Sequence, residues 1–199
     1  MKTGIETNKR LQCLKPVLKK WITLNGEFSK RWKHWSDAPW WYGERANISV
    51  FAGATWQAKG LAFEEYAALK RGEKEDYSGR IDLEFYVGKY RFLAEAKQCW
   101  PTVRRGASYI HSFVKKTKKD IQKCRPDGYS RLAIVFGSPK IKGKLNLVER
   151  HEKIHEIIVQ AKKVEHDAIA WVFPKLKKFP HDKDWVYPGI IVWIKEVRR

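Results

Sequence analysis

The sequence predicts a mixed α/β domain, and three observations lead to that fold class. Residues 78–97 alternate in the way that is typical of two strands joined by a tight turn, and residues 131–138 form a short, continuous apolar run. Between them, residues 103–124 have the periodicity of a helix. The chain has 199 residues, which is long enough to bury one sizeable core. Helices and strands therefore alternate within one predicted domain.

The first 55 residues predict a helical, basic and Trp-rich N-terminal arm. Residues 7–21 place apolar side chains at helical spacing among lysines and arginines. Residues 28–42 interleave four tryptophans with basic residues that include Arg31 and Lys33. This mixture fits either rings that stack on nucleic-acid bases or rings that pack on the rest of the protein. We expect the main domain to cover residues 56–199.

Residues 44–51 and 54–71 are predicted to be helical. In the second segment an apolar stripe begins at Leu61, and Gly72 is suited to end the helix. Glu64 borders this stripe, so an acid on a helix would lie next to the core. Glu65 is about as well placed, and periodicity does not choose between the two.

The segment around Gly88-Lys89 carries the strongest functional signal. A glycine at the first central position suits a two-residue hairpin turn, and counting outward from it places Asp82 opposite Glu95. Directly opposed like charges destabilise a sheet by roughly 0.2–1 kcal/mol, unless a cation lies between them. Lys97 shares a face with Glu95 because side chains alternate along a strand. The hairpin thus predicts two acids and an amine in one place.

The remaining elements follow the hairpin in order. Residues 103–124 predict a long basic helix, whose lysine-rich face is either solvated or in contact with phosphates. The apolar run 131–138 predicts a strand that is covered on both faces. A helix over 145–163, strands over 166–173 and 187–197, and a basic loop over 174–185 complete the expected order.

Charge indicates the class of partner. Lys and Arg total 41 against 22 Asp and Glu, which gives a formal net charge of +19 and favours a polyanion such as nucleic acid. A basic protein at a membrane surface is the competing interpretation. The sequence holds no apolar run of membrane-spanning length, and its first residues are too polar for a signal peptide. We expect no membrane partner and a cytoplasmic location.

These residue types predict metal-assisted hydrolysis of a phosphodiester. Asp82, Glu95 and the carbonyl oxygen of Ala96 would hold Mg²⁺, since hard cations prefer oxygen ligands. Lys97 would position the attacking water or stabilise charge on the phosphate. Glu64, or Glu65 in its place, would complete the metal site or accept a proton.

The same residues resemble a known family. Asp82, followed after the hairpin by Glu95-Ala96-Lys97, is similar to the PD-(D/E)xK, or restriction-endonuclease-like, nuclease superfamily. Taken together with Gly60-x-x-x-Glu64 and residues 79–83, these motifs are similar to its archaeal Holliday-junction-resolvase-like branch. The resemblance implies an αβββαβ core with a mixed sheet, a divalent metal and a DNA substrate, and it favours Glu64 over Glu65. We therefore expect a Mg²⁺-dependent DNA endonuclease that also accepts Mn²⁺.

Basic side chains are candidates for contact with that DNA. We expect this role for Arg31, Lys33, Arg80, Arg104, Arg105, Lys115, Lys116, Lys118 and Lys119. Cutting both strands of a duplex usually takes two active sites, so a homodimer is one possible assembly. The sequence leaves open whether the substrate is duplex, branched or single-stranded DNA, or RNA.

Two alternatives compete with the nuclease. The first is a catalytically inactive nucleic-acid-binding protein of the same fold. The second is a zinc peptidase, because His151-Glu152-x-x-His155 places two histidines on one face of a predicted helix. Charged neighbours crowd this motif, and Glu165 and His166 are only weak candidates for a third ligand, so a solvated helix face fits it better.

Overall fold

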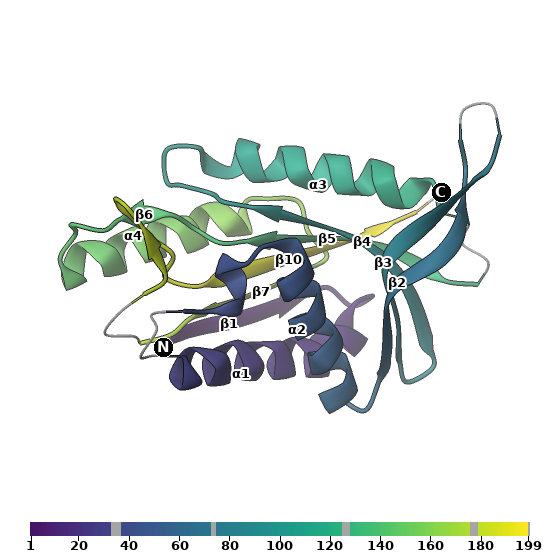
Figure 1. Ribbon diagram of the computed structural model, residues 1–199, viewed down its shortest axis with the longest axis horizontal. Helices are drawn as coiled ribbons and strands as arrows, with labels where there is room; N and C mark the ends of the chain where they lie inside the picture. Colours follow the sequence, from purple (N-terminus) through teal and green to yellow (C-terminus); the bar gives the residue numbers. More distant parts are fainter. Residues whose placement is uncertain (33–36, 73–74, 125–127, 176–178, 199) are drawn as a thin grey trace.

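The computed structural model of the chain describes residues 1–32, 37–72, 75–124, 128–175 and 179–198 (Figure 1). Within them, seven strands form one sheet: β1 (Lys2–Thr7), β2 (Leu61–Lys70), β3 (Tyr77–Val87), β4 (Tyr90–Cys99), β5 (Ser130–Gly137), β7 (Ala168–Phe173) and β10 (Ile190–Val197). A smaller sheet consists of β6 (Ile141–Lys142), β8 (His181–Asp182) and β9 (Trp185–Val186). The helices are α1 (Lys15–Arg31), α2 (Glu44–Gln57), α3 (Gly106–Gln122) and α4 (Leu147–Lys162), with short 3₁₀ turns η1 (Gln12–Leu14) and η2 (Pro39–Trp41).

The large sheet is mixed, as the sequence predicts. Its strand order is β1-β7-β10-β5-β4-β3-β2, and β4 and β5 run parallel while the other neighbours are antiparallel. A parallel neighbour needs a crossover connection, and α3 supplies it between β4 and β5. The sheet is therefore part of a mixed α/β fold.

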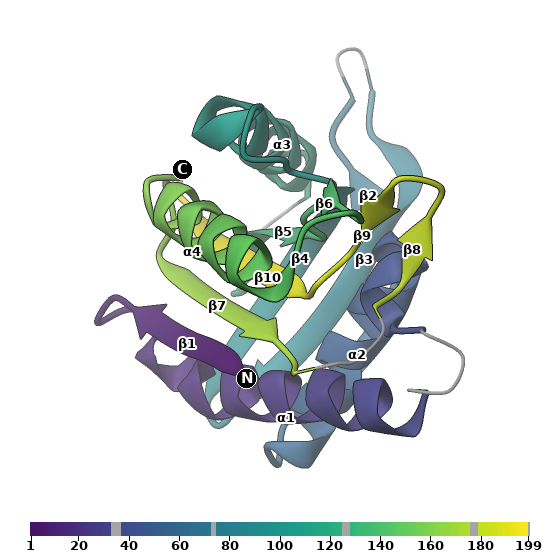
Figure 2. The ribbon, with the colours of Figure 1, turned by 90° about the vertical axis from the view of Figure 1, so that its left-hand side faces the viewer.

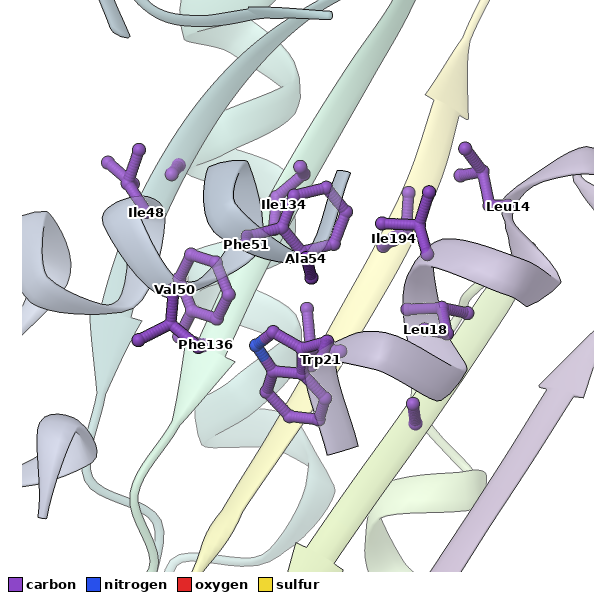
Figure 3. Packing of buried hydrophobic residues seen from close by; sticks show 14 of the residues in the cluster. Leu14, Leu18, Trp21, Ile48, Val50, Phe51, Ala54, Ile134, Phe136 and Ile194 are labelled. Atoms are coloured by element: carbon purple, nitrogen blue, oxygen red, sulfur yellow. The ribbon is translucent and has the colours of Figure 1, made fainter. Parts of the chain in front are cut away.

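Helices cover both faces of the sheet. The helices α1 and α2 lie on one face, and α3 and α4 lie on the other (Figure 1 and Figure 2). On the first face, Trp21 from α1 and Phe51 from α2 are fully buried in the same cluster as Phe136 from β5 (Figure 3). On the second face, Ile110 from α3 and Ile154 from α4 pack in one cluster with residues of the sheet. Both apolar sides of the sheet are thus removed from water.

Local turn chemistry is confirmed at the hairpin. The strands β3 and β4 meet at Gly88-Lys89, and Val87 pairs with Tyr90 as the two-residue turn requires. Gly88 has a φ of 57°, a region that glycine enters at low cost. The helices predicted over 103–124 and 145–163 are α3 and α4, and the apolar run 131–138 is β5.

The predicted helix over residues 54–71 is wrong beyond Gln57, because the chain from Leu61 to Lys70 is strand β2. The helix α2 ends where Lys59 takes a positive φ of 63° and Gly60 packs against β3. A Cβ at Gly60 would lie 2.3 Å from the carbonyl oxygen of Tyr86, so this close approach needs glycine. Pairing of β2 with β3 then outweighs the helical preference of the local sequence.

The described residues among the first 55 share the sheet and core of the rest of the chain. The strand β1 pairs with β7, and the predicted helix over 7–21 begins later, at Lys15, and extends to Arg31. The indoles of Trp21 and Trp40 are fully buried in the main core, as expected for rings that pack on the protein. The boundary predicted after residue 55 falls inside α2.

The basic segment 174–185, predicted as a loop, contributes β8 and the start of β9 to the small sheet. Among the residues described, no helix is both long and apolar enough to cross a membrane.

Candidate functional site

The strands β3 and β4 separate at Asp82. Their ladder ends with the pair Leu83 and Ala94, after which β3 continues alongside β2 and β4 continues alongside β5. Asp82 therefore lies one residue beyond the last pair, at the fork between the two strands. Its Oδ2 atom accepts a hydrogen bond of 2.7 Å from the backbone N–H of Ala96. The predicted direct pairing of Asp82 with Glu95 is thus replaced by a side-chain bond to the next residue of β4.

Glu95 is a buried carboxylate next to this fork, with 4% of its surface exposed. Burial, together with the charge of Asp82, raises the pKa of Glu95 to about 7, although Lys70 and Lys97 oppose the shift. The thiol of Cys124 donates to Glu95 at 3.8 Å. Near neutral pH this carboxyl group is therefore partly protonated, and a nearby cation would favour its charged form.

The partner of Glu95 is Lys70, at the end of β2. Lys70 Nζ lies 2.6 Å from Glu95 Oε1, and their side chains are 12% and 6% exposed. Burial lowers the pKa of Lys70, but the hydrogen bond and the charge of Glu95 outweigh burial and leave the pKa raised. Gly79 leaves space for the side chain of Lys70 to reach Glu95, because a Cβ at position 79 would lie 2.9 Å from Cδ of Lys70. Sequence reasoning missed Lys70, since it assigned this residue to a helix.

Lys97 is the cation at the centre of the site. Its Nζ donates a hydrogen bond of 2.9 Å to the carbonyl oxygen of Ala96. The same atom lies 4.0 Å from Glu44 Oε1 and 4.0 Å from Asp120 Oδ2, which come from α2 and α3 on opposite faces of the sheet. The predicted amine is therefore surrounded by carboxylates at the edge of the fork.

Glu44 is the helix-borne acid that reaches the site. It is the first residue of α2, a position where a carboxylate is stabilised by the helix dipole. Its Oε2 atom accepts a hydrogen bond of 3.2 Å from the backbone N–H of Gln98. Burial raises the pKa of Glu44; the charge of Lys97 opposes that shift and the charge of Asp82 adds to it. Sequence reasoning missed this residue, although an acid at the start of a predicted helix was the available signal.

Glu64 lies on β2, where it pairs with Leu83, the residue next to Asp82 in the sequence. It is exposed on β2, and its Oε2 accepts a hydrogen bond of 2.9 Å from the hydroxyl of Ser49. Its neighbour Glu65 has a positive φ of 55° and forms ion pairs of 3.6 Å with Arg45 and 3.4 Å with Arg80. The expectation that Glu64 projects from a helix is corrected, because this segment is a strand. Among the acids that border the site, Glu44 is the one on a preceding helix.

The carboxylate oxygens of this site are chemically suited to bind a hard cation. Burial raises the pKa of both Glu95 and Glu44, and the charge of Asp82 adds to both shifts. Oxygen donors of this kind are the ones that Mg²⁺ prefers. In the described residues, however, no three His, Cys, Asp or Glu side chains are grouped closely enough to hold a metal ion. Asp82 and Glu95 instead bond to Ala96 and Lys70.

The predicted DNA contacts are spread over several elements of the fold. Arg104 and Arg105 line a cavity before α3, while Lys115, Lys116 and Lys119 are exposed on α3. Lys118 is half-buried and pairs with Glu165 at 3.5 Å, and Arg80 pairs with Glu65. Arg31 is exposed at the end of α1. Lys33 lies outside the described residues.

The histidine motif lies on the surface of α4. His151, Glu152 and His155 are all exposed, and the carbonyl oxygen of His151 accepts a hydrogen bond from Lys2. In the part of the chain that the structure describes, no third ligand groups with the two histidines. A solvated helix face accounts for this geometry.

No family model, no curated protein and no solved structure matches the chain. The site around Lys97 combines Asp82 and Glu95 of the predicted hairpin with Glu44, an acid on the helix that precedes β2.

Proposed function

We propose that the protein is a Mg²⁺-dependent DNA endonuclease with a restriction-endonuclease-like core. The order α2, β2, β3, β4, α3 and β5 follows the αβββαβ pattern expected from the sequence, and the parallel pair β4 and β5 fits it as well. The observation that carries the proposal is the position of Lys97, whose Nζ lies 4.0 Å from Glu44 and donates to the carbonyl oxygen of Ala96, the residue whose N–H binds Asp82. Lysine and carboxylates at a strand fork are suited to phosphodiester hydrolysis.

Each residue has a proposed task. Asp82, Glu95 and the carbonyl oxygen of Ala96 would hold Mg²⁺, with Mn²⁺ able to replace it. When bound, the metal would polarise the scissile phosphate and lower the pKa of a coordinated water. Lys97 would orient that water and offset charge on the phosphate. Glu44 takes the task first expected of Glu64, because its raised pKa suits it to accept a proton.

The substrate class follows from charge. A net charge of +19 and the exposed lysines of α3 favour a polyanion, and DNA is the polyanion that this chemistry would cut. A homodimer would bring two such sites to a duplex. Binding should weaken as salt rises, because each lysine that contacts a phosphate releases counterions.

A catalytically inactive DNA-binding protein is the second candidate, and the Lys70–Glu95 ion pair favours it. The ammonium of Lys70 lies 2.6 Å from a proposed metal ligand, so it satisfies the carboxylate that a metal would otherwise neutralise. Under the endonuclease proposal, Mg²⁺ must displace Lys70 from Glu95. Under the alternative, Lys70 holds this position permanently.

Cleavage assays separate the two candidates. Purified protein is incubated with supercoiled, linear and branched DNA in Mg²⁺ or Mn²⁺, beside Asp82→Ala and Lys97→Ala variants. The endonuclease should cut at least one DNA, and each variant should lower the rate by about 10²-fold or more. Lys20→Ala removes an exposed lysine of α1 that is not among the proposed DNA contacts, and this matched control should retain cleavage. Salt-sensitive binding without any cleavage would establish the inactive protein instead.

A further inference from the structure

A cavity of about 700 Å³ is lined in part by Trp100, which directly follows β4, the strand that carries Lys97. Residues 100–105, which connect β4 to α3, form one side of it, and residues of β6, β9 and α4 form the others. Its volume lies within the range of about 300–1,000 Å³ that is typical of sites for small ligands. Two backbone hydrogen bonds fix this region, from Ser138 N–H to the Cys99 carbonyl (2.9 Å) and from Lys140 N–H to the Pro101 carbonyl (2.9 Å).

Two indoles line the cavity. Trp100 follows β4 and Trp185 lies on β9, and both are half-buried and pack against the main core. Lys142 faces Trp185 across the β6–β9 pair, and its Nζ lies 4.4 Å from the centroid of that ring. Because the rings are held by the core, they would lose little entropy when a flat ligand stacks on them.

Every charged residue that is described in the lining is basic: Arg104, Arg105, Lys140, Lys142 and Lys153. Lys153 has an ion-pair partner, Glu156, at 2.9 Å. Basic side chains around aromatic rings are the combination that binds single-stranded nucleic acid, in which cations meet phosphates while bases stack. The cavity therefore has the chemistry of a nucleotide site.

The cavity is near enough to Lys97 to bind the same DNA strand. Trp100 is three residues beyond Lys97, which is about 10 Å along an extended chain. That length corresponds to about three steps of a DNA strand at 3.4 Å per step. A base can stack on an indole only when it has left its own stack, and a cavity of this size admits one base rather than a duplex.

We propose that this cavity binds an unpaired nucleotide of the substrate, with its base on Trp185 and its phosphates on the surrounding cations. The inference builds on the proposed function, because it specifies the DNA as one with a single-stranded segment next to the cut. It predicts a preference for tailed or branched DNA over an intact blunt duplex.

Binding without any divalent metal tests this proposal separately from catalysis. The full chain is titrated, in EDTA, into a labelled blunt duplex and into the same duplex with a single-stranded thymine tail at the 5′ or the 3′ end. The tailed DNA of one polarity should bind about tenfold more tightly, as expected for one stacked base. Trp185→Ala should remove this advantage while the affinity for the blunt duplex stays within about twofold.

Controls keep the result interpretable. Trp185→Phe retains a ring and should retain most of the preference, whereas Trp56→Ala, an exposed indole on α2 outside the cavity, should change nothing. Oligothymidylate should displace the tail, and polyglutamate of equal charge should not. Thermal unfolding of each variant verifies that it is folded.

Two outcomes would overturn the inference: equal affinity of the natural chain for tailed and blunt DNA, or equal weakening of both by Trp185→Ala. Displacement by polyglutamate would overturn it as well, in favour of an acidic protein partner. A tail preference without cleavage in Mg²⁺ would retain the nucleotide site and reject the endonuclease. Cleavage without a tail preference would retain the endonuclease and reject the nucleotide site.

Discussion

Lys70 Nζ lies 2.6 Å from Glu95 Oε1, so the end of β2 is tied to the middle of β4 across the intervening strand β3. Both side chains are almost fully buried, and breaking one partner of such a pair leaves a charge without compensation. The pair therefore links the stability of the sheet edge to the protonation of the proposed metal ligand.

Replacement of Lys70 by methionine should destabilise the protein in a pH-dependent way. At pH 8 Glu95 is ionised, and its unpaired charge should lower the free energy of unfolding by about 3 kcal/mol. At pH 5 Glu95 is largely protonated, so the loss should be much smaller. Urea unfolding at the two pH values measures both. The double variant Lys70→Met/Glu95→Gln should recover most of the loss, and an equal loss at both pH values would contradict an ionic pair.

The raised pKa of Glu95 predicts how stability depends on pH. Burial and the charge of Asp82 raise this pKa from an ordinary value of 4.5 to about 7. Between those values the folded protein holds a proton that the unfolded chain has released, so stability falls as the pH rises. Glu95→Gln lacks this titration, and its free energy of unfolding relative to the natural chain should increase across the window by roughly 3–4 kcal/mol. The difference should be constant below pH 4 and above pH 8.

Glu44 and Glu64 should differ in their effect on cleavage. Glu44→Gln keeps the size of a side chain that lies 4.0 Å from Lys97 but removes its charge and basicity, so the rate should fall about 10²-fold. Glu64→Gln changes an exposed residue that contacts Ser49, and the rate should stay within about twofold. Steady-state rates on one DNA substrate in Mg²⁺ compare the pair. The opposite ranking would return Glu64 to the site.

Gly79 should tolerate alanine only when Lys70 is shortened. A Cβ at position 79 would lie 2.9 Å from Cδ of Lys70, so Gly79→Ala should displace that side chain from Glu95. We expect a loss of about 1–3 kcal/mol in the free energy of unfolding. In a Lys70→Ala background the same substitution should cost little, because the obstructing atoms are gone. A double-mutant cycle by urea unfolding measures this coupling.

The hairpin and the later helices were predictable because their signals are local. Gly88 at the turn sets the register of β3 and β4, and that register brings Asp82 to the strand fork. Residues 61–70 were not predictable in this way. Their alanines, leucines and glutamates favour a helix, and only pairing with β3 and the close approach of Gly60 to Tyr86 make them a strand.

The residues of the candidate site were also predictable only where their grouping is local in sequence. Asp82, Glu95 and Lys97 lie close together in sequence, and their grouping follows from strand alternation. Glu44 and Lys70 reach the site only through the packing of α2 and β2 on the sheet, which no spacing along the chain reveals. The expectation that Glu64 projects from a helix was wrong for the same reason, because Leu61 to Lys70 form strand β2.

The strand β1 has a consequence for how the protein is made. It precedes every other helix and strand that the structure describes, yet its partner β7 comes much later in the sequence, since Lys2 pairs with Phe173 and Thr7 with Ala168. All the elements between β1 and β7 must be synthesised before this edge of the sheet can close, and contacts so distant in sequence slow folding. Until then the apolar face of α1 has no complete sheet to cover. We therefore expect the nascent protein to need protection from aggregation until β7 and β10 are synthesised.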